Sequence, residues 1–491
     1  MKPSEEDEGS TRNEAAVVVL GDVGRSPRMC NHAKMLADEG FDVKLVGFFD
    51  SEPGDVIMEH PRIRIIGIQA PPDSLDSLPP FVQLPIKLVW NAVTLLLALL
   101  FQTSFFNLRV ILMQNPPALP TIPVCFLVAK LKCATFSIDW HNYMYSILKD
   151  KYDLTDEQFE KNDGKKAKIV RCVHFLEGLF GRLSDYNLCV TDAMRRDLIE
   201  KWNVLASTFY DRPPTWKFGR ATSLDGIHEL YHRLARSESV LKGSGPEETI
   251  LTRRDPDGSV HLLPSRPLVL ISSTSWTPDE KFEILLDALV RYENESNEDR
   301  KLPRLLMFIT GKGPLKAAYL EEIRRRNLQN IDVLTPWLEA DDYPKLLASA
   351  DIGISLHTST SGVDLPMKVV DMFGVRVPVL AKKFRCIGEL VEENENGYLF
   401  ENFEELARRI VSLARGFPSD CADLDRLKSN MTRREFESWE VMWHRSAAPG
   451  ADLRMLENGA SRRLRATTQV LALFVLFVIL PVHYLMGTFS L

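Results

Sequence analysis

Residues 17–29, VVVLGDVGRSPRM, lead from an apolar run through two glycines into a segment that carries two arginines. A short apolar run bounded by glycine is typical of a buried strand, and the pattern after it is typical of a helix. Backbone N–H groups at a helix N-terminus attract anions. The glycine spacing fits neither the dinucleotide pattern G-x-G-x-x-G nor the P-loop pattern. The stretch therefore predicts a strand, turn and helix of an α/β domain, in which the turn either binds a phosphate or only connects the two elements.

Short apolar strands alternate with longer amphipathic helices over most of the chain, which is the pattern of parallel sheets covered by helices. A chain of 491 residues is too long for one ordinary core. We therefore predict two doubly wound α/β domains of similar make-up that face each other across a cleft. The predicted strands are 16–20, 42–48, 62–68, 110–114, 134–139 and 187–190 in the first domain, and 267–272, 304–310, 331–334, 352–356 and 377–381 in the second.

The predicted boundaries follow changes in composition along the chain. Residues 217–265 are polar and without clear periodicity, and they contain GSGPEE and RRDPDGS, which is typical of a linker or a mobile insertion. The predicted segments are a disordered acidic N-terminus (1–14), a first Rossmann-like domain that faces the acceptor and the membrane (15–216), the linker or insertion (217–265), a second Rossmann-like domain that binds a nucleotide sugar (266–445), a further linker (446–466) and a transmembrane tail (467–491).

Charge and cysteine content exclude several classes of protein. Lys and Arg number 60 and Asp and Glu number 67, which gives a formal net charge of −7 without a block of basic residues. A nucleic acid is therefore not expected as a partner. The seven cysteines are scattered and form no C-x-x-C pair, which argues against a disulfide framework and against a zinc site. They are typical of reduced thiols in the cytosol.

Residues 467–491, TTQVLALFVLFVILPVHYLMGTFSL, contain no Asp, Glu, Lys or Arg, and about 20 helical residues suffice to cross a bilayer. Arg462, Arg463 and Arg465 precede this stretch, and basic residues beside a span stay in the cytosol. No signal peptide is recognisable at the acidic N-terminus. We therefore expect cytosolic domains held by a C-terminal tail anchor. A second apolar stretch, 88–101, is short for a span and predicts a helix at the membrane surface or in the core.

Three stretches of the second domain carry groups suited to a sugar nucleotide. TGKGP (310–314) follows a strand and opens a helix, so Lys312 and backbone N–H groups can stabilise a diphosphate leaving group. SSTSWT (272–277) also ends a strand, at the edge where α/β sheets bind ligands. In HTSTSGVDLPMKVVDMFG (357–374), Lys368 and Asp371 share one helix face, where they can approach a phosphate and a ribose. Loop capping and a surface ion pair are the alternatives.

The first domain contains IDWHNY (138–143) at the predicted end of a strand. Asp139 and His141 lie two residues apart on an extended chain, so their side chains can point to the same side. A carboxylate and an imidazole placed in this way can supply a general base, and a pair of structural polar residues is the alternative.

Five motifs in this order, GDVGRSPRM, IDWHNYMYSIL, SSTSWTPDEKF, TGKGP and SGVDLPMKVVDMFG, give the chain a resemblance to the chitobiosyldiphosphodolichol β-mannosyltransferase family of dolichol-pathway glycosyltransferases. The resemblance covers residues 16–445. It implies a GT-B fold, GDP-mannose as the donor, GlcNAc2-diphosphodolichol as the acceptor and an inverting transfer that forms a β-1,4 linkage. It also implies a place on the cytosolic face of the endoplasmic reticulum membrane, where other dolichol-pathway mannosyltransferases are candidate partners.

Under this resemblance the catalytic base is expected among Asp139, His141 and Glu177, in that order. No obligatory metal or cofactor is expected, because no D-x-D stands in a suitable place. The chain departs from the Glu-x7-Glu pattern of many GT-B enzymes, since Asp371 holds the second position but Val363 holds the first, beside Asp364. A GT-B enzyme of different donor and acceptor and a catalytically silent partner in a glycosyltransferase complex are the alternatives. The residues expected to bind the donor are Ser273, Thr274, Lys312, Asp364, Lys368 and Asp371, and those expected to bind the acceptor diphosphate are Gly21, Gly24 and Arg28.

Overall fold

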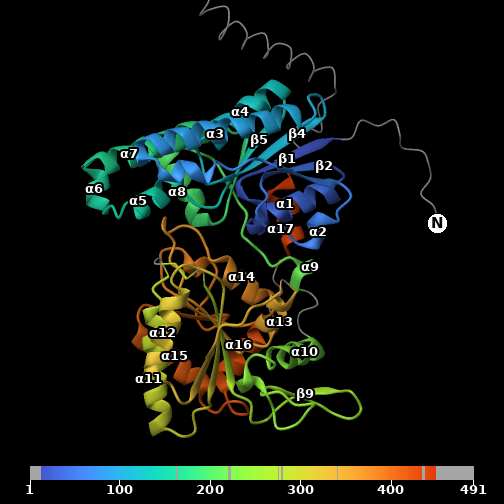
Figure 1. The fold of residues 1–491 in the computed structure, drawn as a ribbon, viewed down its shortest axis with the longest axis vertical. Coiled ribbons are helices and arrows are strands. Elements are labelled where there is room, and N and C mark those ends of the chain that lie inside the picture. Colours follow the sequence, from blue (N-terminus) through green and yellow to red (C-terminus); the bar gives the residue numbers. More distant parts are fainter. Residues whose placement is uncertain are drawn as a thin grey trace, which may run out of the picture. The chain divides into compact units, whose positions relative to one another are not determined.

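The computed structural model describes residues 13–161, 164–218, 223–274, 276–277, 280–339, 341–433 and 437–448. They form two compact units, each built around a parallel sheet (Figure 1). Unit 1 consists of the chain up to Tyr210 and from Met442 onward, and unit 2 consists of Asp211–Val441. The predicted α/β fold with two doubly wound domains is confirmed. The predicted transmembrane tail and the first twelve residues of the predicted N-terminal segment lie outside the described residues.

Unit 1 contains a seven-stranded parallel sheet. Its strands are β1 (Glu14–Asp22), β2 (Asp42–Phe48), β3 (Ile63–Gly67), β4 (Leu108–Asn115), β5 (Thr135–Trp140), β6 (Tyr186–Cys189) and β7 (Ser207–Thr208). The order β3-β2-β1-β4-β5-β6-β7 means that the chain moves outward from β1 to β3 and then returns to β4, on the other side of β1. Ligands of such sheets bind near this reversal, at the carboxyl ends of the strands.

Helices cover both faces of this sheet. They are α1 (Pro27–Asp38), α2 (Asp55–Met58), α3 (Pro80–Phe101), α4 (Thr121–Lys132), α5 (Met144–Lys151), α6 (Asp156–Glu160), α7 (Gly164–Gly181), α8 (Asp192–Trp202) and the returning helix α17 (Trp439–Ser446). Right-handed crossovers place α1 and α2 on one face and α3, α4 and α7 on the other. Figure 1 shows α3, α4 and α7 as one layer, and α17 lies with α1.

The apolar helix predicted over 88–101 is longer than expected. α3 has 22 residues, and its segment Val82–Phe101 is the one stretch within the described residues that is long and apolar enough to cross a membrane. The sequence interpretation placed its start too late, because Pro85 and Lys87 interrupt the apolar run without ending the helix. Only 17% of the most apolar window of α3 is buried, so the alternative of a buried core helix is wrong.

α3 is firmly attached to unit 1 at its C-terminal end. The ammonium of Lys132, at the end of α4, donates hydrogen bonds to the backbone oxygens of Leu99, Leu100 and Thr103 at 2.8 to 2.9 Å. The carbonyls of Leu99 and Leu100 are among those that a helix leaves without an internal partner. The helix is thus fixed to the layer beneath it, in a crossover between β3 and β4 of the same sheet.

Unit 2 contains a six-stranded parallel sheet with a similar reversal. Its strands are β10 (Leu268–Ser273), β11 (Leu305–Thr310), β12 (Ile331–Leu334), β13 (Ile352–Ser355), β14 (Val379–Lys382) and β15 (Gly397–Phe400). The helices beside it include α11 (Glu283–Glu298), α12 (Lys316–Arg326), α13 (Asp342–Ala348), α14 (Met367–Gly374), α15 (Phe403–Ala414) and α16 (Ala422–Arg433). The order β12-β11-β10-β13-β14-β15 places the switch point between β10 and β13.

The segment predicted as a linker or insertion, 217–265, contains regular structure. Its elements are the end of α9 (Thr215–Phe218), α10 (Leu224–Leu234) and a hairpin of β8 (Thr252–Arg254) and β9 (Val260–Leu262). Ile227, Leu230 and Tyr231 of α10 are buried in a hydrophobic cluster of unit 2. Their spacing is that of an amphipathic helix, which the sequence interpretation missed.

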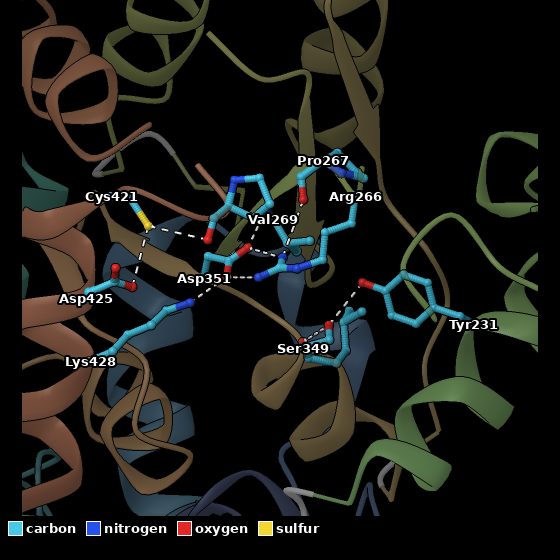
Figure 2. Close-up of polar contacts among 11 residues, drawn as sticks. Tyr231, Arg266, Pro267, Val269, Ser349, Asp351, Cys421, Asp425 and Lys428 are labelled. Atoms are coloured by element: carbon cyan, nitrogen blue, oxygen red, sulfur yellow. Dashed lines mark hydrogen bonds and ion pairs between the residues drawn. The ribbon is translucent and has the colours of Figure 1, made fainter. Parts of the chain in front are cut away.

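A buried charge network lies at the amino ends of the strands in unit 2 (Figure 2). Arg266 donates to the two carboxylate oxygens of Asp351 at 2.7 and 2.9 Å, and Lys428 of α16 donates to one of them at 2.5 Å. Burial would raise the pKa of Asp351, but the two cations hold it below its usual range. Asp351 directly precedes β13, at the edge opposite to the one where ligands bind, so the network is structural.

Candidate active site

A buried carboxylate lies near the carboxyl end of β5 in unit 1. Asp139 accepts two hydrogen bonds from Arg28 of α1, at 2.7 Å from Nε and 2.9 Å from Nη2. Nε2 of His32 is 3.1 Å, and Nε2 of His141 is 2.9 Å, from the same oxygen of Asp139. The structure therefore brings together three predicted residues and adds His32, which the sequence analysis missed. Its position one helical turn after Arg28 was the available signal.

The returning helix α17 determines where the protons of this cluster lie. Nε1 of Trp443 donates a hydrogen bond to Nδ1 of His32 at 3.1 Å. An indole nitrogen only donates, so Nδ1 of His32 accepts and its Nε2 carries the proton directed at Asp139. An ionised carboxylate only accepts, so Nε2 of His141 also donates. In the neutral imidazole of His141 this leaves Nδ1 unprotonated, and among the described residues Nδ1 has no hydrogen-bond partner.

The charges around Asp139 keep it ionised. Burial would raise the pKa of Asp139, but the Arg28 guanidinium, His141 and the hydrogen bonds from both imidazoles hold it well below its usual range. Burial lowers the pKa of His32, which agrees with a neutral imidazole at this position. A carboxylate with such a low pKa is a poor proton acceptor near pH 7. The geometry therefore favours His141 over Asp139, which the sequence analysis had placed first.

Glu177, the third candidate base, holds the start of α5. Its buried carboxylate accepts hydrogen bonds from the backbone N–H groups of Met144 and Tyr145 at 2.8 and 3.1 Å, and from Nδ2 of Asn115 at 2.9 Å. Burial raises the pKa of Glu177 to about 7, against the effect of these hydrogen bonds. The backbone oxygen of Asn115 accepts from the N–H of His141 at 2.8 Å. Glu177 therefore positions the loop that carries His141.

In the glycine turn after β1, the carboxylate of Asp22 occupies the backbone N–H groups that could otherwise bind a phosphate. Oδ1 of Asp22 accepts from the backbone N–H groups of Gly24 and Ser51 at 3.3 and 3.1 Å. A Cβ on Gly24 would lie 2.3 Å from the backbone oxygen of Ser51, so this glycine permits a close approach of two loops. Gly21 lies within β1, and Arg28 is buried against Asp139. The predicted binding of the acceptor diphosphate by Gly21, Gly24 and Arg28 stays a prediction that these contacts do not favour.

In unit 2 the predicted donor residues gather near the carboxyl ends of β10 and β11. Oγ of Ser273 lies 3.0 Å from Oγ1 of Thr310 and 3.2 Å from the hydroxyl of Tyr343. Tyr343 is also close enough to Asp371 on α14 to influence the pKa of that carboxyl group. Burial raises the pKa of Asp371 to about 6, while Lys217 and the Tyr343 hydroxyl act in the opposite direction. Tyr343 and Lys217 are neighbours that the sequence analysis did not identify.

Lys368 of α14 pairs with a carboxylate that the sequence analysis also missed. Its Nζ donates to one oxygen of Glu280 at 2.7 Å, and Oγ1 of Thr274 donates to the other oxygen. Glu280 is buried, whereas the Lys368 side chain remains 30% exposed. Glu280 lies within the motif SSTSWTPDEKF, and that membership was the signal for it. The pair joins α14 to the loop after β10, which places an accessible ammonium at the ligand edge of the sheet.

The loop after β11 brings Lys312 to the same edge. Gly311 has φ +121°, and a Cβ there would lie 1.9 Å from the backbone oxygen of Thr274, so only glycine fits. Nζ of Lys312 lies 3.9 Å from the ring centre of the exposed Trp337. An ammonium over an exposed ring stays available to an anionic ligand.

Asp364 lies in a serine-rich loop rather than in α14. Its carboxylate accepts hydrogen bonds from the hydroxyls of Ser359 and Ser361, the second at 3.1 Å, and Nε2 of His357 is 3.5 Å from its other oxygen. In the described parts of the chain, no group of three or more His, Cys, Asp or Glu residues is placed to hold a metal ion.

Two doubly wound units with polar and charged groups at their switch points are typical of the GT-B fold of glycosyltransferases. Residues 266–415 match the family described as Glycosyl transferases group 1. The chain resembles the solved structure of Anabaena Alr3699/HepE in complex with UDP and glucose, with a TM-score of 0.58 and 16% identity over 90% of this chain and 100% of that one. It also resembles WaaG, a glycosyltransferase involved in lipopolysaccharide biosynthesis, with a TM-score of 0.55 and 10% identity over 90% and 100%. At these identities the likeness concerns the fold alone.

Relatives with higher identity define the family. Proteins named Chitobiosyldiphosphodolichol beta-mannosyltransferase from Homo sapiens and Pongo abelii are each 43% identical over 451 residues, which is 90% of this chain and 93% of each relative. A protein of Arabidopsis thaliana named UDP-glycosyltransferase TURAN is 38% identical over 467 residues, 89% of this chain and 97% of the relative. The chain belongs to the chitobiosyldiphosphodolichol β-mannosyltransferase family, which confirms the predicted resemblance and the predicted class of enzyme.

Proposed function

We propose that the chain transfers mannose from GDP-mannose, with inversion and in β-1,4 linkage, to the terminal GlcNAc of GlcNAc2-diphosphodolichol. This reaction is an early step of lipid-linked oligosaccharide assembly on the cytosolic face of the endoplasmic reticulum. Membership of the family supports the substrates. The observation that carries the chemistry is the imidazole of His141, which an ionised carboxylate orients at the carboxyl edge of unit 1.

In the proposed mechanism Nδ1 of His141 accepts the proton of the acceptor's 4-hydroxyl while that oxygen attacks the anomeric carbon of mannose. The bond from the anomeric carbon to the diphosphate breaks, and its electron pair leaves with GDP. Asp139 orients the imidazole through Nε2 and stabilises the imidazolium that forms. His32 and Arg28 in turn hold Asp139, and they act through it rather than on the substrate.

The donor is bound by unit 2 in this proposal. Lys312 and Lys368 stabilise the negative charge that develops on the diphosphate, and Asp371 accepts hydrogen bonds from the ribose. Ser273, Thr274 and Asp364 complete the polar edge around the nucleotide sugar. Because Lys312 and Lys368 supply the positive charge that stabilises the diphosphate, no obligatory metal or cofactor is proposed. Transfer should therefore persist in EDTA.

For the acceptor diphosphate we assign Arg25, at the end of the glycine turn, in place of Arg28. The Arg25 side chain is 82% exposed, and its Nε lies 3.3 Å from Asp22. An exposed ion pair of this kind is weak, so the guanidinium can turn to a phosphate at little cost. Arg25→Ala should raise the KM for the acceptor and leave the KM for GDP-mannose unchanged. The reverse pattern would refute the assignment.

We propose that residues 467–491 anchor the enzyme in the endoplasmic reticulum membrane, with both units cytosolic and other dolichol-pathway mannosyltransferases as neighbours. The arginines at 462, 463 and 465 favour this orientation. A glycosylation acceptor tag placed after Leu491 should be glycosylated, because the C-terminus would lie in the lumen. An unmodified tag on a protein that carbonate extracts would overturn the anchor.

The test of the reaction is transfer by the full chain from radiolabelled GDP-mannose to a phytanyl-diphosphate-linked chitobiose in detergent. The product should be sensitive to β-mannosidase, and linkage analysis should give a 1,4 bond. UDP-glucose and UDP-GlcNAc are assayed in parallel, because the Arabidopsis relative is named a UDP-glycosyltransferase. Preference for a UDP-sugar would overturn the proposed donor.

A histidine pair tests the base. His141→Gln should lower kcat by about 100-fold or more with little change in the KM for GDP-mannose, because general base catalysis contributes that much. The matched control is His261→Gln, at an exposed position on β9 of unit 2, which should leave kcat unchanged. Equal activity of both variants would exclude His141 as the base.

A further inference from the structure

The outer side of the helix layer of unit 1 exposes many large apolar side chains. In this layer α3 and α7 each pack against α4, and we call the exposed residues of these two helices the α3–α7 face. Exposed apolar patches on a protein surface mark sites of interaction with another protein or a membrane. The side chains that characterise the face are Leu84, Val89, Val93 and Leu97 on α3, and Phe175 and Leu179 on α7.

The exposed charge of α7 is positive, although the chain as a whole has a formal net charge of −7. Lys165, Lys166, Lys168 and Arg171 of α7 are exposed, and the acid of this helix, Glu177, is buried. Among the described residues, no carboxylate lies within ion-pair distance of Lys165, Lys166 or Lys168. On the neighbouring helix α6, two of the acidic residues are already paired, Asp156 with Lys149 and Glu157 with Lys161.

Hollows along the two helices offer room for lipid. A groove of about 520 Å³ beside α3 is lined by Ile86, Val89 and Val93. A second hollow of about 440 Å³ combines Phe175 with Arg171. Cations beside apolar side chains suit an anionic headgroup with its acyl chain, as in helices that lie in a membrane interface.

We propose that the α3–α7 face docks on the anionic surface of a lipid bilayer, with α3 lying along the membrane rather than crossing it. The inference rests on the proposed function, since it says how unit 1 meets the membrane that holds the acceptor. α3 cannot cross while unit 1 is folded, because it joins two strands of one sheet and Lys132 closes its C-terminal end. Leu95 and Leu99 on its inner side are buried against unit 1, and Nε1 of Trp90 donates to the backbone oxygen of Gln69 at 2.9 Å.

A single exposed cysteine on α7 provides a site for attaching a fluorescent probe. Cys172 of α7 is exposed, whereas the other six cysteines are buried. An environment-sensitive NBD group can therefore be attached to Cys172 in the native full chain. The labelled protein is reconstituted into phosphatidylcholine vesicles with about 30% phosphatidylserine, which supplies the anionic surface that attracts basic residues. The emission should shift to the blue and be quenched by spin-labelled lipids, and it should do so less in pure phosphatidylcholine or in high salt.

Two sets of variants separate the contributions of charge and apolar contact. Lys165→Gln with Lys168→Gln should lower the ratio of inserted to free label about 30-fold, since each basic residue contributes roughly 1 kcal/mol at an anionic surface. Phe175→Asn with Leu179→Asn should also reduce insertion. The matched control is Leu262→Asn on the exposed strand β9 of unit 2, which should leave insertion unchanged. All these variants should keep transfer to a short-chain acceptor in detergent.

The outcomes distinguish this inference from the proposed function. A label that stays in water in anionic vesicles, in a preparation that transfers mannose, would overturn the docking and leave the reaction standing. A label that is protected without lipid, in proportion to protein concentration, would make the face a protein interface and also overturn it. Insertion of the label in a chain that transfers no mannose would support the docking and refute the proposed function.

Discussion

Replacing Trp443 with phenylalanine tests whether α17 determines the protonation of His32, which acts on the candidate base His141 through Asp139. The substitution keeps an aromatic ring at a buried position and removes the N–H that donates to Nδ1 of His32. Nδ1 then loses the hydrogen bond that Trp443 donates at this buried position. The single proton of His32 cannot move there, because a lone pair on Nε2 would then face the carboxylate of Asp139. Binding of a second proton is the remaining response, so the variant favours a charged His32.

The size of the effect follows from the lost hydrogen bond. A buried polar group without its partner costs about 1–3 kcal/mol, and 1.36 kcal/mol corresponds to one pKa unit. The pKa of His32, which burial now lowers, should therefore rise by about one to two units in Trp443→Phe. A charged His32 would join Arg28 in neutralising Asp139, which weakens the stabilisation of an imidazolium at His141. Each 1.4 kcal/mol lost there costs about tenfold in rate.

The assay is kcat/KM for mannose transfer as a function of pH, from about pH 5.5 to 8.5, where a histidine base titrates. The matched control is Trp202→Phe, because this tryptophan is also buried in unit 1 and its Nε1 has no hydrogen-bond partner among the described residues. The Trp443 variant should lose activity most strongly at the acidic end, and the control should not. Profiles of the same shape for both variants would refute the reasoning, as would histidine ¹⁵N shifts that report an unchanged His32.

Three further predictions concern unit 2. Lys368→Ala should lower kcat about 100-fold or more, because removing one preorganised charge typically costs that much, whereas a loss below tenfold would make Lys368 only a partner of Glu280. Because the pKa of Asp371 is about 6, the KM for GDP-mannose should rise as the pH falls through about 6, and Asp371→Asn should remove this dependence. The folded-state pKa of Asp351 lies below the ordinary value of 3.8, so its contribution to stability is present above that value and is lost as the pH falls through the folded-state pKa. In denaturant unfolding at neutral pH, Asp351→Asn should lower the free energy of unfolding by about 3–5 kcal/mol, and the stability of the variant should depend less on pH in the acidic range. A loss below about 1 kcal/mol would contradict the structural role of the network.

The order of strands and helices could be predicted because each buried parallel strand is a short apolar run between turn residues. The predicted strands 42–48 and 331–334 coincide with β2 and β12. α10 was missed because its few buried side chains lie among charged residues in a passage rich in glycine and proline. α3 was predicted too short because Pro85 and Lys87 interrupt the apolar run without ending the helix.

The candidate site could be predicted only where its residues end a strand. Asp139 and His141 were found in this way, because ligands bind at the carboxyl edge of parallel sheets. Their partners come from distant parts of the chain: His32 is 107 residues from Asp139, and Trp443 is 411 residues from His32. Contacts over such separations depend on how helices pack against the sheet, which no local pattern encodes. The assignment of Arg28 to a phosphate shows the same limit, because its partner is Asp139, 111 residues away.

The path of the chain explains why the proposed base depends on the last described helix. The chain leaves unit 1 at Tyr210, forms unit 2 and returns at Met442. On its return, the backbone oxygen of Ser446 accepts a hydrogen bond from the hydroxyl of Tyr186 at 2.5 Å, which fixes α17 beside β6. Trp443 then holds His32 in the form that donates to Asp139, and Asp139 holds His141. The sheet of unit 1 positions these side chains, but the proton positions required of a base are completed only when the chain has formed unit 2 and come back.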